Sequence, residues 1–261
     1  MNELLDLATR AAASAADLLV QGWDQREVVA TKSSQTDIVT QMDQGSEALL
    51  VSTILAERPD DAILGEEGSS RSGTTGVSWV IDPLDGTVNY LYGFPSWAVS
   101  VGVLIDDRPM VGVVHAPALA TVWRGIADDF AEANGRPIRC GGVTEVSAAL
   151  VATGFGYDPA VRAVQGVQVA ALLPQIRDIR RAGAAAVDMC WVAQGVVDAY
   201  FERGTHLWDR AAAMAICSGA GARVGGLLGE EPASNAMTVA ANPALFEALR
   251  ATLQEVGVGR D

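Results

Sequence analysis

Acidic side chains gather in two short segments of the chain, and each segment follows a predicted buried strand. Glu66 and Glu67 come directly after the apolar residues 62–64. Asp82 and Asp85 follow a second apolar run. Because open α/β sheets collect ligands where strands end in turns, we expect these carboxyl groups to lie close together. Neighbouring carboxylates repel one another unless a cation lies among them, and Mg²⁺ takes hard oxygen ligands of this kind. The pattern therefore predicts a magnesium site.

The spacing of the second segment, Asp-Pro-Leu-Asp-Gly-Thr from Asp82 onward, also favours a binding site. The proline fixes its own φ and restricts Asp82 to extended backbone, while the glycine lets the chain turn tightly. Asp82, Asp85 and the carbonyl of Leu84 can therefore face one point. If Thr87 opens a short helix, the free amides of Gly86 and Thr87 point there too and attract phosphate. The alternative is a plain surface turn, which the preceding apolar strand and the nearby acids disfavour.

The composition of the 261-residue chain excludes several classes of protein. Lys plus Arg number 18 and Asp plus Glu 32, so the net charge of −14 argues against binding to nucleic acid or to an anionic membrane. Three cysteines without a CxxC pair predict a reducing compartment. No apolar run reaches the roughly 18 residues of a membrane span, and Glu3 and Asp6 stand where a secretory signal would be positively charged. We expect a cytoplasmic globular protein.

Hydrophobic periodicity predicts helices and strands in alternation, which implies layers of helix and sheet. The expected helices span residues 4–22, 43–58, 159–173, 185–195, 209–219 and 243–256. The expected strands span residues 62–64, 78–81, 150–153, 198–202 and 237–240, with another near 179 and an antiparallel meander over 97–123. A Gly- and Ser-rich loop is expected at 68–76. We expect an N-terminal half at 1–138 that carries most of the acidic site and a C-terminal half at 139–261 that completes it.

Several motifs in a fixed order resemble those of the inositol monophosphatase family, most closely its actinobacterial members. They are Gly-Glu-Glu at 65–67, Trp-Val-Ile-Asp-Pro-Leu-Asp-Gly-Thr-Val-Asn-Tyr at 79–90, Trp208-Asp209, Asp37-Ile38-Val39-Thr40 followed by Asp43, Asn-Gly-Arg-Pro at 134–137, Gly-Ala-Ala-Ala at 183–186, and Asp-Ala-Tyr-Phe-Glu at 198–202. The resemblance covers most of the chain. It implies a layered αβαβα sandwich of the sugar phosphatase type, α+β in its N-terminal half and α/β in its C-terminal half, and a homodimer.

The same resemblance implies which residues bind the metal ions. Glu66, Asp82 and the carbonyl of Leu84 are expected to hold one Mg²⁺. Asp82, Asp85 and Asp209 are expected to hold a second, and Glu66 could share a weaker third ion. Mn²⁺ could replace Mg²⁺, and lithium is expected to inhibit. Two ions about 3.5–4 Å apart suit an in-line displacement by water, which needs neither a histidine base nor a covalent nucleophile.

The resemblance further implies the residues that handle water and substrate. Thr87 and Asp43 are expected to activate the attacking water, with Glu67 close behind them. The substrate is expected to contact a larger set: Glu66, Leu84, Asp85, Gly86, Thr87, Gly183, Ala184, Ala185, Glu202 and Asp209. Simpler interpretations stay open, because Asp43 and Asp209 could be helix caps and Glu202 a solvated rim residue.

The expected function is magnesium-dependent hydrolysis of inositol monophosphate. Fructose-1,6-bisphosphatase, histidinol-phosphate phosphatase and 3′(2′),5′-bisphosphate nucleotidase are alternatives that could use the same metal residues, and Glu202 favours a polyol among them. An alternative from another class is a regulatory protein that keeps the fold and binds, for instance, the transcription machinery. Two residues depart from the family pattern: Ala184 replaces a serine or threonine, and Gly219 replaces a glutamate. The first concerns sugar specificity and the second local packing.

Overall fold

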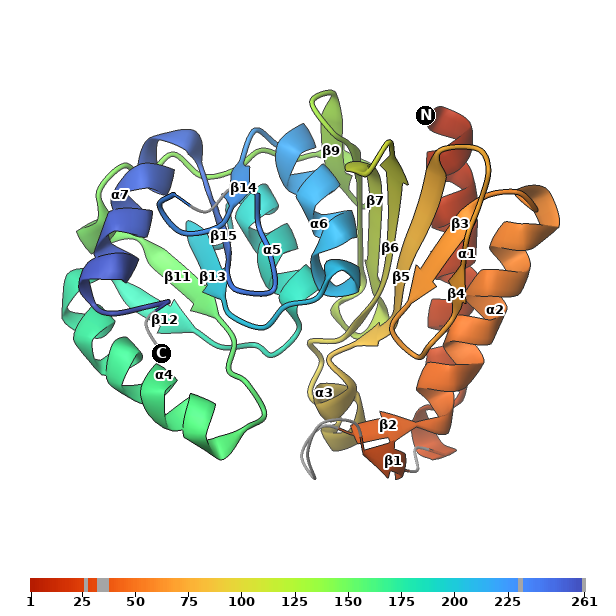
Figure 1. Ribbon diagram of the computed structural model, residues 1–261, viewed down its shortest axis with the longest axis horizontal. Coiled ribbons are helices and arrows are strands. Elements are labelled where there is room, and N and C mark those ends of the chain that lie inside the picture. Colours follow the sequence, from red (N-terminus) through yellow and green to blue (C-terminus); the bar gives the residue numbers. More distant parts are fainter. Residues whose placement is uncertain (26–27, 32–37, 230–231, 260–261) are drawn as a thin grey trace.

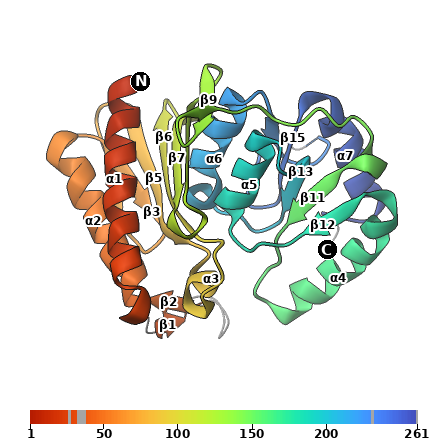
Figure 2. The same ribbon diagram turned by 180° about the vertical axis from the view of Figure 1, so that it is seen from behind.

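Two long helices open the chain, and each buries one face; that of α1 is apolar, whereas that of α2 also holds polar residues. The computed structural model describes residues 1–25, 28–31, 38–229 and 232–259, so Asp37 of the motif set lies outside it. Helix α1 (Asn2–Gln21) buries residues three or four positions apart, from Leu5 to Leu19, as its periodicity predicts. Helix α2 (Gln41–Glu57) lies beside it, and both cover one face of the larger sheet (Figures 1 and 2).

The larger sheet places two acidic segments at one edge. Its strands are β3 (Ala62–Gly65), β4 (Ser70–Arg71), β5 (Val77–Asp85), β6 (Ala98–Ile105), β7 (Arg108–Ala116), β8 (Thr121–Ile126), β9 (Phe130–Ala133) and β10 (Arg136–Pro137). They lie in the order β10-β9-β8-β7-β6-β5-β3-β4. The meander is confirmed, and Asp106 and Asp107 turn it with φ of 48° and 62°. Strands β3 and β5 run parallel, so both end at the same edge.

A smaller sheet forms the core of the second half. Its strands are β11 (Leu150–Thr153), β12 (Asp178–Arg180), β13 (Ala199–Glu202), β14 (Arg223–Gly225) and β15 (Thr238–Ala241), in the order β12-β11-β13-β15-β14. Strand β11 is parallel to its two neighbours, whereas β15 is antiparallel to both of its own. Helices α4 (Pro159–Leu172) and α7 (Pro243–Glu255) lie on the outer side, far from α1 (Figure 1).

Helices α5 (Ala185–Gln194) and α6 (Leu207–Gly219) form the middle layer between the two sheets (Figure 1). Helix α6 packs closely on the larger sheet because glycines on both elements lie at the contact. A Cβ on Gly112 would overlap the backbone of Ala212 and lie 2.7 Å from its carbonyl carbon. A Cβ on Gly219 would lie 2.6 Å from the carbonyl carbon of Phe130, so the departure from the family's glutamate suits this close packing. The layers are helix, sheet, helix, sheet, helix, as expected.

The structure corrects several predicted boundaries. Strand β5 does not end at Ile81 but continues through the Asp-Pro-Leu-Asp segment to Asp85, with a register shift between Asp82 and Asp85. Helix α6 begins at Leu207 and not at Asp209, because His206 is its N-cap. The expected loop at 68–76 contains the short strand β4.

Several short strands escaped prediction: β1 (Val28–Thr31), β2 (Ile38–Thr40), β4, β9, β10 and β14. The boundary near residue 138 stays a prediction, since α6 from the second half packs on the sheet of the first. Within the described ranges, no helix has the length and apolar content needed to cross a bilayer.

We predict that Gly112→Ala will lower the free energy of unfolding by about 1–3 kcal/mol, the usual cost of overpacking. The added methyl group meets the backbone of α6, which cannot rotate away as a side chain could. Urea unfolding followed by circular dichroism measures the effect. Gly142→Ala is the matched control, because a Cβ there has no neighbour within 4 Å. Equal stability of the two variants would contradict the packing argument.

A candidate active site between the two sheets

A cleft of about 570 Å³ opens where the ends of β3 and β5 meet the N-termini of three helices. The helices are α5, α6 and the short α3 (Thr87–Tyr92) that follows β5. Its lining residues come from both halves of the chain: Glu66, Asp82, Leu84, Asp85, Gly86, Thr87, Phe155, Gly156, Tyr157, Asp158, Val161, Arg181, Gly183, Ala185, Glu202, Arg203, Gly204, Thr205, His206, Trp208 and Asp209. Most of the residues proposed from the sequence therefore share one cavity. Asp43, Glu67 and Ala184 do not line it.

Parallel pairing brings the two acidic segments of the first half together. Gly65 pairs with Ile81, and the amide of Glu66 donates to the Ile81 carbonyl at 3.2 Å. Glu66 and Asp82 therefore follow paired positions on neighbouring strands. The expectation that these acids meet at one edge of the sheet is confirmed.

The Asp82–Thr87 segment turns sharply into α3. Asp82 accepts a hydrogen bond from the amide of Leu84 at 3.0 Å. Gly86 has φ of 86°, and a Cβ there would lie 2.8 Å from the carbonyl oxygen of Ser96, so both conformation and space favour glycine. The turn presents Leu84 and Asp85 to the cleft, and α3 begins at Thr87, which meets the condition set for the amides of Gly86 and Thr87.

Asp43 is buried outside the cleft and is hydrogen-bonded to Thr87, which lines it. The Thr87 hydroxyl lies 3.0 Å from Oδ1 of Asp43 and 3.1 Å from the carbonyl oxygen of Leu84. Oδ2 of Asp43 accepts from the amide of Thr40 at 2.8 Å and from its hydroxyl at 2.5 Å. Asp43 thus caps α2 with one oxygen and contacts Thr87 with the other. Burial raises the pKa of Asp43, and the hydrogen bonds from Thr40 oppose that rise.

Asp85 joins the two halves of the molecule. Its carboxylate accepts from the backbone amides of Ala185 at 3.2 Å and Ala186 at 2.8 Å, in the first turn of α5. Burial raises the pKa of Asp85 to about 7 against these stabilising bonds, and repulsion from Glu202 and Glu66 adds to the rise. This contact was not visible in the sequence, because nothing local indicates which helix the carboxylate will cap.

Asp82 and Asp209 also line the cleft, and they repel each other and Asp85. Burial raises the pKa of Asp82 well above the usual range, and Glu66, Asp85 and Asp209 raise it further. Burial likewise raises the pKa of Asp209 well above normal, although its Oδ2 accepts from the amide of His206 at 2.6 Å. Asp209 is therefore the third residue of α6 in a capping box as well as a wall of the cleft.

The donors around the cleft fit a hard divalent cation. They are carboxylate oxygens and a backbone carbonyl, the ligands that Mg²⁺ prefers. Burial and mutual repulsion raise the pKa of Asp82, Asp85 and Asp209, so a cation among them would stabilise their ionised forms. As the side chains stand, no group of three or more acids, histidines or cysteines in the described residues is arranged to hold an ion. A bound ion would have to draw the carboxyl groups together.

Glu202 is held in place at the far wall of the cleft. Its Oε2 accepts from the hydroxyl of Tyr200 at 2.8 Å. Gly154 gives it room, since a Cβ on that residue would overlap the Glu202 carboxyl group. Burial raises the pKa of Glu202, whereas the Tyr200 hydroxyl and the charge of Arg181 lower it. These contacts show an oriented acid and not a freely solvated rim residue.

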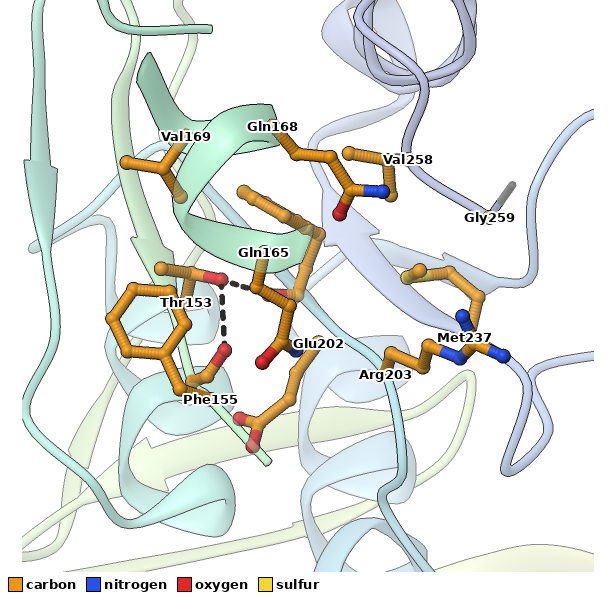
Figure 3. A pocket seen from close by; sticks show the side chains of 12 residues that line it. Thr153, Phe155, Gln165, Gln168, Val169, Glu202, Arg203, Met237, Val258 and Gly259 are labelled. Atoms are coloured by element: carbon orange, nitrogen blue, oxygen red, sulfur yellow. Dashed lines mark hydrogen bonds between the residues drawn. The ribbon is translucent and has the colours of Figure 1, made fainter. Parts of the chain in front are cut away.

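A second cavity lies beside Glu202, but it cannot hold a substrate. Its volume is about 10 Å³, room for about one water molecule. Figure 3 shows Glu202 and Arg203 pointing in different directions at its edge. The Thr153 hydroxyl donates to the carbonyl of Phe201 at 2.8 Å. The larger cleft is therefore the candidate site.

Ala184 and Glu67 lie just outside the cleft. The Ala184 side chain is buried against the turn at Gly86, because this residue is the N-cap of α5 and packs inward. Glu67 is half-buried, and its amide donates to Glu47 of α2 at 2.8 Å.

Three supporting residues were missed by sequence reasoning: Glu47, Tyr200 and Asp188. Glu47 and Asp188 are acids on buried helix faces, and such positions in a predicted amphipathic helix are the signal that could have found them. Burial raises the pKa of Asp188 well above normal, with Glu202 and Asp85 adding repulsion.

Known proteins match this chain over nearly all of its length. Residues 1–257 match the model of the inositol monophosphatase family. Inositol-1-monophosphatase of Mycobacterium bovis is 44% identical over 237 residues, which cover 87% of this chain and 81% of that protein. Nus factor SuhB of Escherichia coli is 33% identical over 259 residues, covering 98% and 97%. Among solved structures, Mycobacterium tuberculosis SuhB has 37% identity and a TM-score of 0.84, covering 99% of this chain and 98% of that chain. Inositol monophosphatase from Anabaena has 32% identity and a TM-score of 0.85, covering 98% and 97%.

We predict that the metal-free protein will lose stability as the pH rises from about 5 to about 8. A carboxyl group with a raised pKa binds a proton in the folded state that the unfolded chain has already released. Its contribution is complete below the ordinary carboxyl pKa and is lost as the pH rises through the folded-state value, which is about 7 for Asp85. Urea unfolding in excess EDTA at several pH values measures the slope.

Asp85→Asn is the control for this slope, since the amide cannot ionise but can still accept a bond from α5. The variant should lose less stability over the same range. Burial lowers the pKa of His115, so the contribution of this residue to stability increases as the pH rises. That effect is the same in the parent and in Asp85→Asn, and it cancels when the two slopes are compared. Parallel curves for the two proteins would contradict the assignment to Asp85.

Proposed function

The chain belongs to the inositol monophosphatase family of phosphoric monoester hydrolases, and from that membership we propose that it hydrolyses inositol monophosphate to inositol and phosphate with Mg²⁺ as its cofactor. The observation that carries the proposal is the gathering of Glu66, Asp82, Asp85 and Asp209 around the start of α3. A phosphate group attracted to that helix start would lie among acids that need cations.

We assign the metal ligands as the resemblance implied. Glu66, Asp82 and the Leu84 carbonyl would hold one ion, and Asp82, Asp85 and Asp209 the second, with a weaker third near Glu66. Magnesium, when bound, supplies positive charge that polarises the phosphate ester and promotes ionisation of water. Mn²⁺ could take its place, because it accepts the same oxygen ligands.

The Thr87–Asp43 pair is suited to orient the attacking water. The Thr87 hydroxyl has one proton, which it can donate to Oδ1 of Asp43 at 3.0 Å. Its oxygen is then left as an acceptor for a proton of the water. Since the other oxygen of Asp43 is bonded to Thr40, the carboxylate cannot rotate away from Thr87. Glu67 stays close behind as support for Glu66.

Substrate contacts divide between a phosphate end and a ring end. Asp85 and the amides of Gly86 and Thr87 would border the phosphate, at the start of α3. The ring would meet a set of residues at the opposite wall: Gly183, Ala184 through its backbone, Ala185, Glu202 and Asp209. An oriented carboxylate such as Glu202 accepts hydrogen bonds from vicinal hydroxyls, which favours a polyol over the alternative sugar and nucleotide phosphates.

Further properties accompany this function. We expect a homodimer in the cytoplasm, with no nucleic-acid or membrane partner, and the three free cysteines suit a reducing compartment. Lithium should inhibit by competing at the second ion's carboxylates. A regulatory role is the second candidate, because a relative 33% identical is named a Nus factor. The complete acidic set favours catalysis, and an inactive variant that kept a regulatory phenotype would separate the two roles.

We predict that Asp82→Asn will lower kcat by several orders of magnitude without unfolding the protein. The change removes a carboxylate proposed to contact both ions, yet it relieves repulsion among buried acids. Phosphate release from inositol monophosphate, with and without Mg²⁺, measures the effect, and circular dichroism checks the fold. Full turnover of the unaltered enzyme in excess EDTA would contradict the proposal. So would a kcat of Asp82→Asn within tenfold of that of the unaltered enzyme.

A paired prediction separates recognition from chemistry. Glu202→Ala should lower kcat/KM for inositol monophosphate. The loss should correspond to about 1–2 kcal/mol of transition-state free energy, the contribution of one ordinary hydrogen bond. It should leave p-nitrophenyl phosphate, which has no ring hydroxyl, nearly unaffected. Tyr200→Phe should show a weaker effect of the same kind, because it frees the Glu202 carboxylate. Thr87→Ala should slow both substrates alike. Equal losses on both substrates for Glu202→Ala would remove the argument for a polyol.

A further inference from the structure

Glu47 lies beneath the turn that carries Glu66. It is on α2, one helical turn after Asp43, and its side chain is 4% exposed. Oε2 accepts from the amide of Glu67 at 2.8 Å, and Oε1 accepts from the amide of Ser69 at 2.9 Å. Both oxygens of this buried acid are therefore used by backbone amides of one short turn.

The turn is shaped to fit that carboxylate. A Cβ on Gly65 would overlap Oε2 of Glu47 and lie 2.7 Å from its Cδ. All three of the nearest atoms that such a Cβ would meet belong to Glu47. The turn is also closed on itself, since the Gly65 amide donates to the Ser69 carbonyl at 2.7 Å. Gly65 is thus required by the presence of Glu47 and not by an unusual backbone conformation.

Helix α2 supports the site at two other points. Asp43 holds Thr87, and the hydroxyl of Ser46 donates to the carbonyl of Pro83 at 2.8 Å. One buried face of α2 therefore contacts both acidic segments, because residues three or four apart lie side by side on a helix. Glu47 supplies the contact to the Glu66 segment.

We propose that Glu47 is a positioning residue that fixes the turn at 65–69 and so sets the affinity of the site for Mg²⁺. The inference rests on the proposed function, in which Glu66 is a metal ligand. Glu47 does not line the cleft, so it acts through the backbone that carries Glu66. A glutamine cannot replace it, because its amide nitrogen would place a donor against a backbone N–H.

The first experiment compares Glu47→Gln with Glu57→Gln, the same change at the exposed end of the same helix, where Glu57 pairs with Arg10. Calorimetric titration with MgCl₂ should show about tenfold to hundredfold weaker binding for Glu47→Gln, the usual loss when support of a ligand is removed. The control should match the parent. Excess Mg²⁺ should restore most of kcat in Glu47→Gln, which it would not do for a merely misfolded enzyme.

The second experiment needs no metal. Hydrogen exchange of the metal-free protein should be faster at the amides of Glu67 and Ser69 in Glu47→Gln than in Glu57→Gln. Gly65→Ala should weaken Mg²⁺ binding in the parent, but much less in a Glu47→Ala background, where the clash is gone. This cycle keeps the test valid if one variant alone folds poorly.

The outcomes separate the two proposals. Unchanged amide exchange, or Mg²⁺ affinity within twofold of the control, would overturn the role of Glu47 while leaving the proposed function standing. Failure of the unaltered chain to bind Mg²⁺ would overturn the proposed function and this role together. Faster exchange with weaker, metal-rescued activity would support both.

Discussion

Crowding of carboxyl groups in one cleft is the constraint on which the rest of the structure depends. Burying like charges near one another is costly, and the pKa values of Asp82, Asp85 and Asp209 rise accordingly. Each of these acids is nevertheless stabilised by a backbone amide, from Leu84, from the start of α5 or from His206. The protein thus holds the acids where they repel, which is the arrangement that a multivalent cation relieves.

The layered fold makes that arrangement possible because it aims several chain ends at one place. Parallel pairing of β3 and β5 sends two strands to the same edge, and α3, α5 and α6 begin there. Close packing of α6 on glycines of the larger sheet keeps Asp209 against the acids of the first half. The amides at the start of α5 donate hydrogen bonds to Asp85 and so join α5 to the same centre. The cleft is therefore a property of the way the two halves of the chain pack together.

The two ends of the cleft differ in how their side chains are held. At the proposed reaction end, Asp43 and Thr87 form a short chain of hydrogen bonds that leaves little rotational freedom. At the proposed recognition end, Glu202 is oriented by Tyr200 and by the missing side chain of Gly154. Rigid support of both ends would suit the proposed reaction, in which a phosphate must be aligned with water while ring hydroxyls are distinguished.

The sequence by itself determined the order of elements and most of the acids around the cleft. Regular apolar spacing predicts α1, and the Asp-Pro-Leu-Asp-Gly-Thr run predicts a tight turn after a buried strand, since both depend on residues a few positions apart. Short strands such as β4 and β10 escaped because both of their residues are exposed and leave no apolar pattern. Only the tertiary structure decided that Asp85 caps a helix 101 residues away, that Glu47 supports the Glu66 turn, and that Ala184 packs inward. Local patterns encode which backbone conformation a segment prefers, whereas these contacts depend on how finished elements pack, and no short stretch of chain contains that information.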